Sequence, residues 1–139
     1  MGYVYADVEL LNGDDLALER RYLLGSDEVH RMNVNILVDT GSLMLAINEN
    51  IKEILQLQVV ETRNIQLADS SIHNYEVVVP VEVRFKNRRF IGNAIVLPGD
   101  SEPLLGAIPL EDMDVMIHPA RQELIVNPEH PDRAFLKVK

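Results

Sequence analysis

The sequence contains no cysteine in its 139 residues. This absence excludes a disulfide framework, a zinc site built from thiolates and a cysteine nucleophile. It is compatible with a reducing compartment, in which disulfides are rare. The N-terminal residues also lack the basic start and apolar core of a signal peptide, so we expect a cytoplasmic protein.

Long apolar runs and positive charge are also scarce. The apolar stretches are far shorter than the ~20 residues of a membrane-spanning helix, so no membrane partner is expected. The chain has 13 Lys and Arg against 22 Asp and Glu, and its formal net charge is −9. The basic residues are scattered, and the one local group, KNRR at 86–89, is interpreted as a solvated hairpin turn. Nucleic acid is therefore not an expected partner.

Patterns for binding metal are missing as well. The four histidines are His30, His73, His118 and His130. None of them forms a paired spacing such as H-E-x-x-H. Asp112 and Asp114 lack the surroundings of a calcium loop and are interpreted as solvated. We therefore expect no metal.

What is present is an ordinary globular composition. Hydrophobic residues make up 47% of the chain and charged residues 25%, which is unlike a disordered protein. A chain of this length suits one domain better than two. The proline-rich residues 127–139 predict an irregular C-terminal tail.

An N-terminal strand is predicted by alternation of apolar residues with other residues. The apolar positions are Val4, Ala6, Val8 and Leu10. Asn12-Gly13 then favours a turn, and the stretch from Leu16 to Leu24 could return as a second strand.

The rest of the chain predicts further short strands. We expect them over residues 34–38, 43–47, 59–60, 65–67, 75–85, 89–97 and 123–126. Pro80 indicates an edge position for the strand 75–85, because proline cannot donate a hydrogen bond to a central strand. Short helices are expected after Asn48, which can cap one, and over Pro109 to Met113. The pattern predicts a mostly β fold with one or two short helices.

The segment 34–42, VNILVDTGS, ends an apolar strand on a carboxylate. Burying the charge of Asp39 is costly unless the group is paired, hydrogen-bonded or used in chemistry. Gly41 allows a sharp turn, and the hydroxyls of Thr40 and Ser42 can fix a loop or a carboxylate. Such a carboxylate suits general acid–base catalysis on a water molecule.

One carboxylate cannot supply both an acid and a base at one pH. Two close carboxylates can, because they cannot both ionise and therefore share one proton. The sequence has a single Asp-Thr-Gly. Two copies of the chain related by a two-fold axis would supply two such groups.

In the order of its motifs, the sequence resembles the retropepsin-like aspartic proteases, the single-domain retroviral type and its bacterial relatives. The resemblance rests on the apolar strand leading into residues 37–42, the Leu104-Leu105-Gly106 motif and the helix at 108–113. Together with a closing strand, these features span roughly residues 3–126, most of the chain. The resemblance implies a retropepsin-like closed β-barrel, the single lobe of the acid protease fold, as the domain over residues 1–126.

By this resemblance the protein is an aspartic endopeptidase that works at a homodimer interface. Asp39 of each protomer is implied to be catalytic, with one water held between the two carboxylates and no cofactor or metal. The residues implied to support it are Thr40, Gly41 and Ser42 in the loop, and Leu104, Leu105 and Gly106 in a ψ-shaped crossing beneath it. The implied substrate is an extended peptide or an unfolded protein.

The resemblance also implies a flap, a hairpin that closes over the substrate. Its residues are Leu67, Ala68, Asp69, Ser70, Ser71 and Ile72. Retroviral flaps are rich in glycine, whereas this chain has no glycine between Gly41 and Gly92. This departure supports an alternative, a non-catalytic binding or dimerisation module with the same fold.

Residues 19–33, ERRYLLGSDEVHRMN, are longer than the compact retroviral hairpin needs. We expect a loop insertion here, either a mobile surface loop or a segment that binds a partner. The strands over 4–10 and 123–126 are candidates for joining the two protomers.

Overall fold

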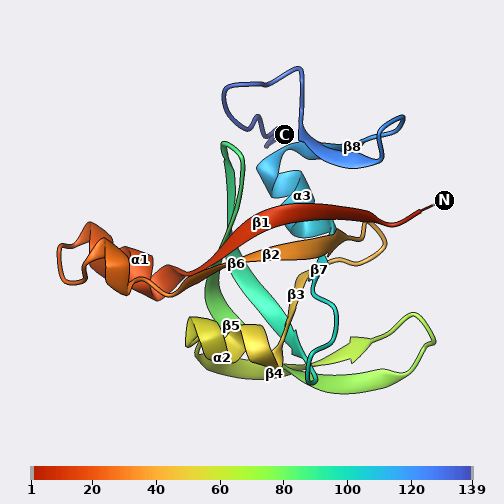
Figure 1. Cartoon of the computed structure of the whole chain (residues 1–139). Coiled ribbons are helices and arrows are strands. Elements are labelled where there is room, and N and C mark those ends of the chain that lie inside the picture. Colours follow the sequence, from red (N-terminus) through yellow and green to blue (C-terminus); the bar gives the residue numbers. More distant parts are fainter. Residues whose placement is uncertain (1, 139) are drawn as a thin grey trace.

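The computed structural model describes residues 2–138 of the chain (Figure 1). Within this range the chain forms nine β-strands, three short α-helices and one turn of 3-10 helix. The prediction of a mostly β fold is confirmed. None of the described helices is long and apolar enough to cross a membrane.

The elements follow one another in short steps along the chain. The first half contains β1 (Val4–Asn12), α1 (Gly13–Arg20), the 3-10 turn η1 (Ser26–Glu28), β2 (Arg31–Val38), β3 (Leu45–Asn48) and α2 (Glu49–Leu55). The second half contains β4 (Val59–Gln66), β5 (Ile72–Phe85), β6 (Arg88–Leu97), β7 (Leu104–Leu105), α3 (Ala107–Met113), β8 (Val115–His118) and β9 (Glu123–Val126). The strands expected over 59–60 and 65–67 are one strand, β4, and β8 has no predicted counterpart.

Seven strands form one mixed sheet in the order β1-β2-β7-β3-β6-β5-β4. β1 also pairs with β5, with Leu10 opposite Val83, so the strands form a near-closed ring. β7 runs parallel to β2 and β3 runs parallel to β6. β8 and β9 form a separate antiparallel hairpin. The ring therefore brings β7 beside the end of β2, although the two strands are far apart in sequence.

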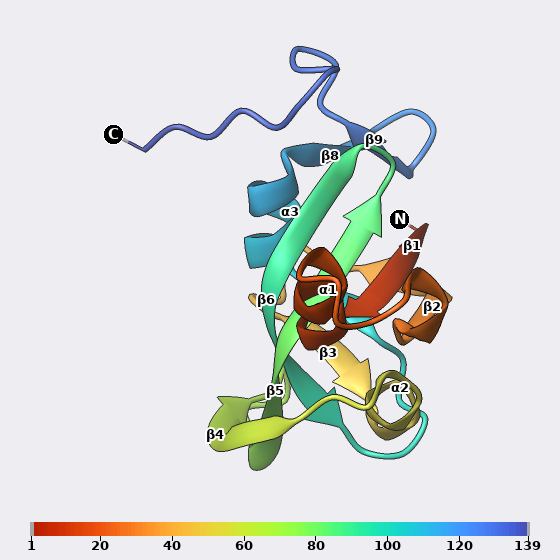
Figure 2. The same ribbon diagram turned by 90° about the vertical axis from the view of Figure 1, so that its left-hand side faces the viewer.

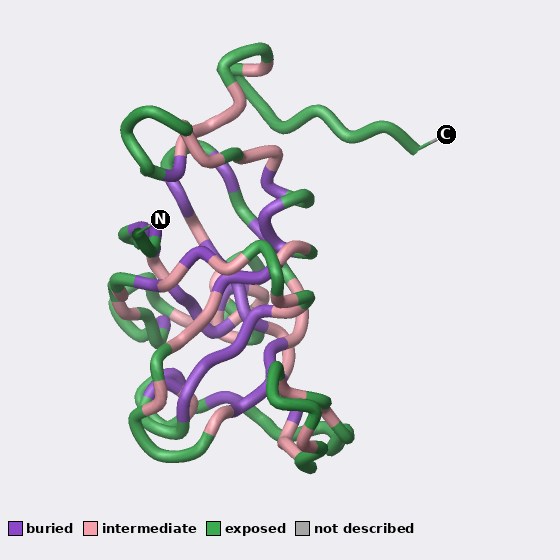
Figure 3. Tube along the Cα trace, turned by 90° about the vertical axis from the view of Figure 1, so that its right-hand side faces the viewer, coloured by how far each residue is buried: buried purple, intermediate pink, exposed green. Residues whose placement is uncertain are grey.

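The main core lies inside this ring, and β1 contributes one face to it. The buried residues of β1 include Val4, Ala6, Val8 and Leu10, as their alternation predicts. Figure 3 shows buried positions along the central strands and exposed positions along the C-terminal tail. Full burial of one such aliphatic side chain is worth ~1.5–3 kcal/mol, so the packed ring holds the loops at its ends in place.

The stretch after β1 is helical, so the prediction of a second strand up to Leu24 is wrong. Asn12 is the N-cap of α1, and its side-chain oxygen accepts a hydrogen bond from the Asp15 N–H at 3.1 Å. Asparagine before glycine favours a hairpin turn, but asparagine is also a preferred N-cap. Here the helix buries Leu16 beside Leu11. The chain thus has three short α-helices instead of the expected one or two.

Residues 13–30, which comprise α1, η1 and the segments around them, form what we call the arm. The expected loop over 19–33 is therefore partly regular, because α1 ends at Arg20 and β2 begins at Arg31. At the base of the arm, the backbone N and ring Nδ1 of His30 lie 2.9 and 2.7 Å from Asp15 Oδ2. The arm is an ordered extension that projects at the left of Figure 1 and faces the viewer in Figure 2.

Helix α1 ends in a strained backbone conformation. Leu23 N–H donates to the Leu18 carbonyl at 2.9 Å, and Tyr22 N–H donates to the Glu19 carbonyl at 3.0 Å. This is the Schellman arrangement, in which glycine usually takes the left-handed position. Here Tyr22 takes it, with a φ of 61° and 95% exposure. Packing within the chain therefore does not offset the strain.

Two further interpretations of the sequence are wrong. Pro80 does not lie on an edge strand, because β5 pairs with β4, β1 and β6. It lies at a register shift between Val78 and Val81, where an irregular ladder tolerates proline. Arg88, in the turn segment expected to be solvated, is buried at 3% exposure.

The tail after β9 is irregular over residues 127–138, but Asp114 anchors it to the end of α3. The Asp114 carboxylate accepts hydrogen bonds from the Asn127 amide and the Phe135 N–H, both at 3.0 Å. It also lies 2.7 Å from His130 Nδ1. The Arg88 guanidinium donates to the His130 carbonyl. The side chain of Asp114 is only 13% exposed, so its interpretation as solvated is wrong.

The anchor predicts a dependence of stability on pH. The Asn127 amide, the Phe135 N–H and His130 lower the pKa of Asp114 below its usual range. On acidification the unfolded chain therefore takes up this proton before the folded chain does. The stabilisation is present above the usual carboxyl pKa of about 4 and is lost as the pH falls through the lower folded value.

We expect Asp114→Asn to lower the free energy of unfolding at neutral pH, with a deficit that shrinks below about pH 4. Urea unfolding of both proteins across this range measures the deficit. Asp100→Asn, in an exposed turn, controls for the loss of one negative charge. A deficit that is the same at every pH would contradict the anchor.

The strained helix end gives a second prediction. Tyr22→Gly should raise the free energy of unfolding by about 0.5–1 kcal/mol, because glycine adopts a positive φ without steric cost. Arg20→Gly, two residues earlier and inside the helix, should lower it by a similar amount. Denaturant unfolding compares the two variants. Equal losses in both would show that the conformation of Tyr22 carries no strain.

Candidate active site

The loop after β2 holds Asp39 through its own backbone and a hydroxyl. Gly41 N–H donates to Asp39 Oδ1 at 3.0 Å, and Ser42 Oγ donates to Asp39 Oδ2 at 3.0 Å. The Ser42 N–H closes the turn on the Asp39 carbonyl at 3.1 Å. Asp39 itself is half-buried. Each carboxylate oxygen thus has a donor and a fixed direction, while the group still reaches solvent.

The Leu104-Leu105-Gly106 motif supports this loop from beneath. β7 pairs with β2 so that Leu105 lies beside Val38, and the Asp39 N–H donates to the Leu105 carbonyl at 3.0 Å. Leu105 is fully buried. A Cβ on Gly106 would lie 2.4 Å from the Met44 carbonyl oxygen, so only glycine permits this close approach of the two segments.

The first turn of α3 completes the support. The Ala107 N–H donates to the Ser42 carbonyl at 2.8 Å, and the Ile108 N–H donates to the Leu43 carbonyl at 2.9 Å. N–H groups at the start of a helix have no partner within the helix, so the loop satisfies two of them. The loop 39–43 is therefore hydrogen-bonded along both β7 and α3.

A cleft of about 780 Å³ lies between the Asp39 loop and the β4–β5 hairpin. Of the residues expected to form the site, those in its lining are Asp39, Gly41, Ser42, Leu67, Ala68 and Leu104. The other lining residues are Leu43, Met44, Ala46, Asn64, Ile65, Gln66, Ile95 and Leu97. Most of these side chains are apolar, so the cleft suits an apolar ligand beside one carboxylate.

The remaining expected residues lie outside the cleft lining. Asp69, Ser70, Ser71 and Ile72 form the outer part of the hairpin turn. Leu105 and Gly106 lie beneath the loop. Thr40 lines a separate cavity of about 250 Å³ with residues of α3, β8 and β9.

The hairpin turn forms without glycine. Leu67 N–H donates to the Ser71 carbonyl at 2.8 Å, and Ser70 takes the left-handed conformation with a φ of 69°. The Ser71 side chain and N–H both donate to Asp69 Oδ1, at 2.5 and 2.9 Å, and together they lower the pKa of Asp69. An aspartate that binds the N–H two residues later mimics a backbone turn. Side-chain hydrogen bonds thus stabilise a turn that glycine often permits.

Sequence reasoning did not identify the cleft walls from β3, β4 and β6. Ala46, Ile65 and Ile95 come from three strands that the ring brings together. Their apolar character marks them as strand residues but carries no signal for a cleft. Neighbouring residues of one strand face opposite sides, which is why Ile95 and Leu97 line the cleft and Val96 does not.

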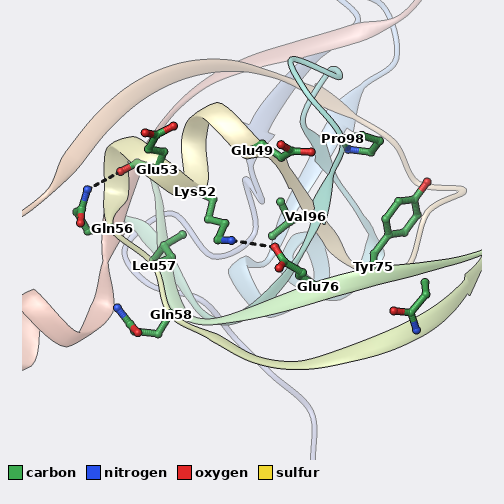
Figure 4. A pocket seen from close by; sticks show the side chains of 11 residues that line it. Glu49, Lys52, Glu53, Gln56, Leu57, Gln58, Tyr75, Glu76, Val96 and Pro98 are labelled. Atoms are coloured by element: carbon green, nitrogen blue, oxygen red, sulfur yellow. Dashed lines mark hydrogen bonds and ion pairs between the residues drawn. The ribbon is translucent and has the colours of Figure 1, made fainter.

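Val96 instead lines a polar groove of about 770 Å³ between α2 and β5 (Figure 4). One ion pair lies in it, with Lys52 Nζ 2.8 Å from Glu76 Oε1. The Gln56 side chain donates to the Glu53 backbone carbonyl at 2.9 Å. The groove and the Asp39 cleft share no lining residue. The polar groove is lined by α2 and the residues after it, and by Asn74, Tyr75 and Glu76 of β5.

Among residues 2–138, no group of three His, Asp or Glu is placed to hold a metal ion. The cleft lining presents one oriented carboxylate beside apolar walls. No protein-family model matches the chain, and no curated protein matches its sequence.

The close approach at Gly106 gives a third prediction. Gly106→Ala should lower the free energy of unfolding by about 1–3 kcal/mol, because the added methyl group would overlap the backbone of residues 43–44. Gly41→Ala is the control, since its methyl group would meet only Asp39 Oδ1, at 3.3 Å. Thermal and denaturant unfolding measure both. Similar small losses would show that the two segments can separate freely.

Proposed function

We propose that this chain is an aspartic endopeptidase that hydrolyses peptide bonds as a homodimer. The observation that carries the proposal is the Asp39 carboxylate, with both oxygens hydrogen-bonded in its loop, in the lining of an apolar cleft beneath a hairpin. In this proposal the near-closed ring is the retropepsin-like barrel and the hairpin is its flap.

Catalysis requires a second carboxylate, and each chain supplies one Asp39. In the proposed dimer the two Asp39 groups share one proton and hold one water. The ionised group takes a proton from the water, whose oxygen attacks the peptide carbonyl carbon, while the other group protonates the carbonyl oxygen. In the resulting diol one hydroxyl gives its proton to the carboxylate that is now ionised, the C–N bond breaks, and the amine leaves with the proton that the other carboxyl group took from the water. The products are a carboxylic acid and an amine, and the dyad again holds one proton. Ser42 and Gly41 keep both carboxylates oriented throughout.

An open face beside Asp39 supports the pairing of two chains. Thr40 is exposed there, and three apolar residues near the loop and α3 keep large exposed areas: Leu43 at 64%, Ile108 at 46% and Met116 at 44%. β1 pairs with β5 only from Glu9 onward, which leaves one edge of residues 4–8 without a strand partner in the described chain. We propose that this face meets the same face of a second copy.

The substrate in this proposal is an extended peptide or an unfolded protein. Such a segment adds strand-like hydrogen bonds along the hairpin, and its apolar side chains lie against Met44, Ile65 and Ile95. The alternative is a non-catalytic binding or dimerisation module. The hydrogen bonds from Ser71 to Asp69 favour this binding module, because they hold the hairpin turn in one conformation and the hairpin then opens less readily.

Asp39→Asn tests the proposal. We expect cleavage of a fluorescently labelled unfolded protein, such as casein, to fall by about three orders of magnitude or more, because both carboxylates of the dyad become neutral amides. Sedimentation of the same variant should still give a dimer. Asp100→Asn, in an exposed turn, should cleave at the normal rate.

Near-normal cleavage by Asp39→Asn would rule out this site. A natural chain that is monomeric at every accessible concentration would rule out the dyad. A dimer that binds unfolded protein without cleaving it would favour the binding module.

A further inference from the structure

The arm, residues 13–30, has no part in the proposed catalysis. Three contacts nevertheless hold it in place. Asn12 caps α1, and the His30 ring contacts the Asp15 carboxylate. Leu16 is buried in a small cluster with Leu11. The cluster is separate from the main core. The arm therefore holds its outer end, which we call the arm tip, in a defined conformation.

The arm tip exposes large apolar side chains. It comprises Leu18, Arg20, Arg21, Tyr22 and Leu23. Tyr22 is 95% exposed, Leu23 70% and Leu18 40%. Tyr22 is also the residue in the left-handed conformation, which glycine would adopt without strain. A tyrosine at this position costs stability and buries almost nothing, so intramolecular packing does not account for it.

Two adjacent positive charges lie at the arm tip. Arg20 and Arg21 are exposed, and neither forms an ion pair within residues 2–138. They lie on a chain with a formal net charge of −9. Tyrosine and arginine are the residue types that most often dominate binding energy at protein interfaces. Because the arm tip is already ordered, docking would cost it little conformational entropy.

We propose that the arm tip docks an acidic segment of a partner protein that also presents an apolar side chain. The partner's carboxylates meet Arg20 and Arg21, and its apolar side chain packs against Tyr22 and Leu23. In Figure 1 the arm projects at the left, whereas the β4–β5 turn lies at the lower right. A docked partner therefore leaves the Asp39 cleft open, and the proposal stands whether or not the chain is a protease.

Fluorescence anisotropy with three labelled synthetic peptides tests the proposal. One peptide combines glutamate with leucine, one lysine with leucine, and one glutamate with serine. The protein carries Asp39→Asn in every measurement so that no peptide is cleaved. We expect only the glutamate–leucine peptide to bind well, and its affinity to fall as salt is added.

Substitutions at the arm tip identify the surface. Tyr22→Gly and the double variant Arg20→Glu, Arg21→Glu should each weaken binding on the order of tenfold or more. Arg89→Glu and Ile91→Ala, which change an exposed charge and an exposed apolar residue on β6, should not. Tyr22→Gly is informative because it should fold at least as well as the natural chain, so its loss of binding cannot be a folding defect.

Several results would overturn the proposal. They are absence of binding of the glutamate–leucine peptide at millimolar concentration, equal binding of all three peptides, and unchanged binding by the arm-tip variants. If the Tyr22→Gly variant forms a smaller assembly than the natural chain in sedimentation, a second copy of the chain occupies the arm tip. Tighter binding of a labelled single-stranded DNA, lost in the arginine variant, would assign it to nucleic acid.

Discussion

The close crossing of β7 beneath the Asp39 loop is the constraint on which the rest of the site depends. Gly106 lies so near the backbone of Met44 that no side chain fits between them. This approach lets Leu105 accept from the Asp39 N–H and lets the first N–H groups of α3 bond to the loop. Because the loop is bonded on both sides, the Gly41 N–H and the Ser42 hydroxyl can be directed at the Asp39 carboxylate.

The cleft follows from the same crossing together with closure of the ring. β7 lies between β2 and β3, so the loop that ends β2 faces the walls contributed by β3 and β6. The β4–β5 hairpin extends from the other side of the ring and covers the cleft. Ser70 adopts the left-handed conformation, which glycine would adopt without strain. Hydrogen bonds between Ser71 and Asp69 stabilise the turn instead. Loop, walls and hairpin therefore form one site from segments spread over most of the chain.

The arm and the tail each contain the same kind of contact. In each, a histidine ring nitrogen lies 2.7 Å from an aspartate oxygen, His30 with Asp15 and His130 with Asp114. Both aspartates also accept backbone N–H bonds, which ties an irregular segment to a helix. These anchors let segments with few buried apolar side chains keep a defined position. They also explain why the Asp114 side chain is only 13% exposed.

The sequence by itself determined the strand periodicity, the short helices after Asn48 and near Pro109, and the motifs at Asp39 and Gly106, because these depend on neighbouring residues. It also indicated the hairpin at 67–72. It did not reveal the helix after Asn12, since Asn-Gly suits a turn and a helix start, and only burial of Leu16 distinguishes them. The cleft walls, the buried Arg88 and the anchor at Asp114 were decided by the tertiary structure alone. Each requires residues far apart in the chain to meet, and no local pattern records which side chains the closure of a ring will bring together.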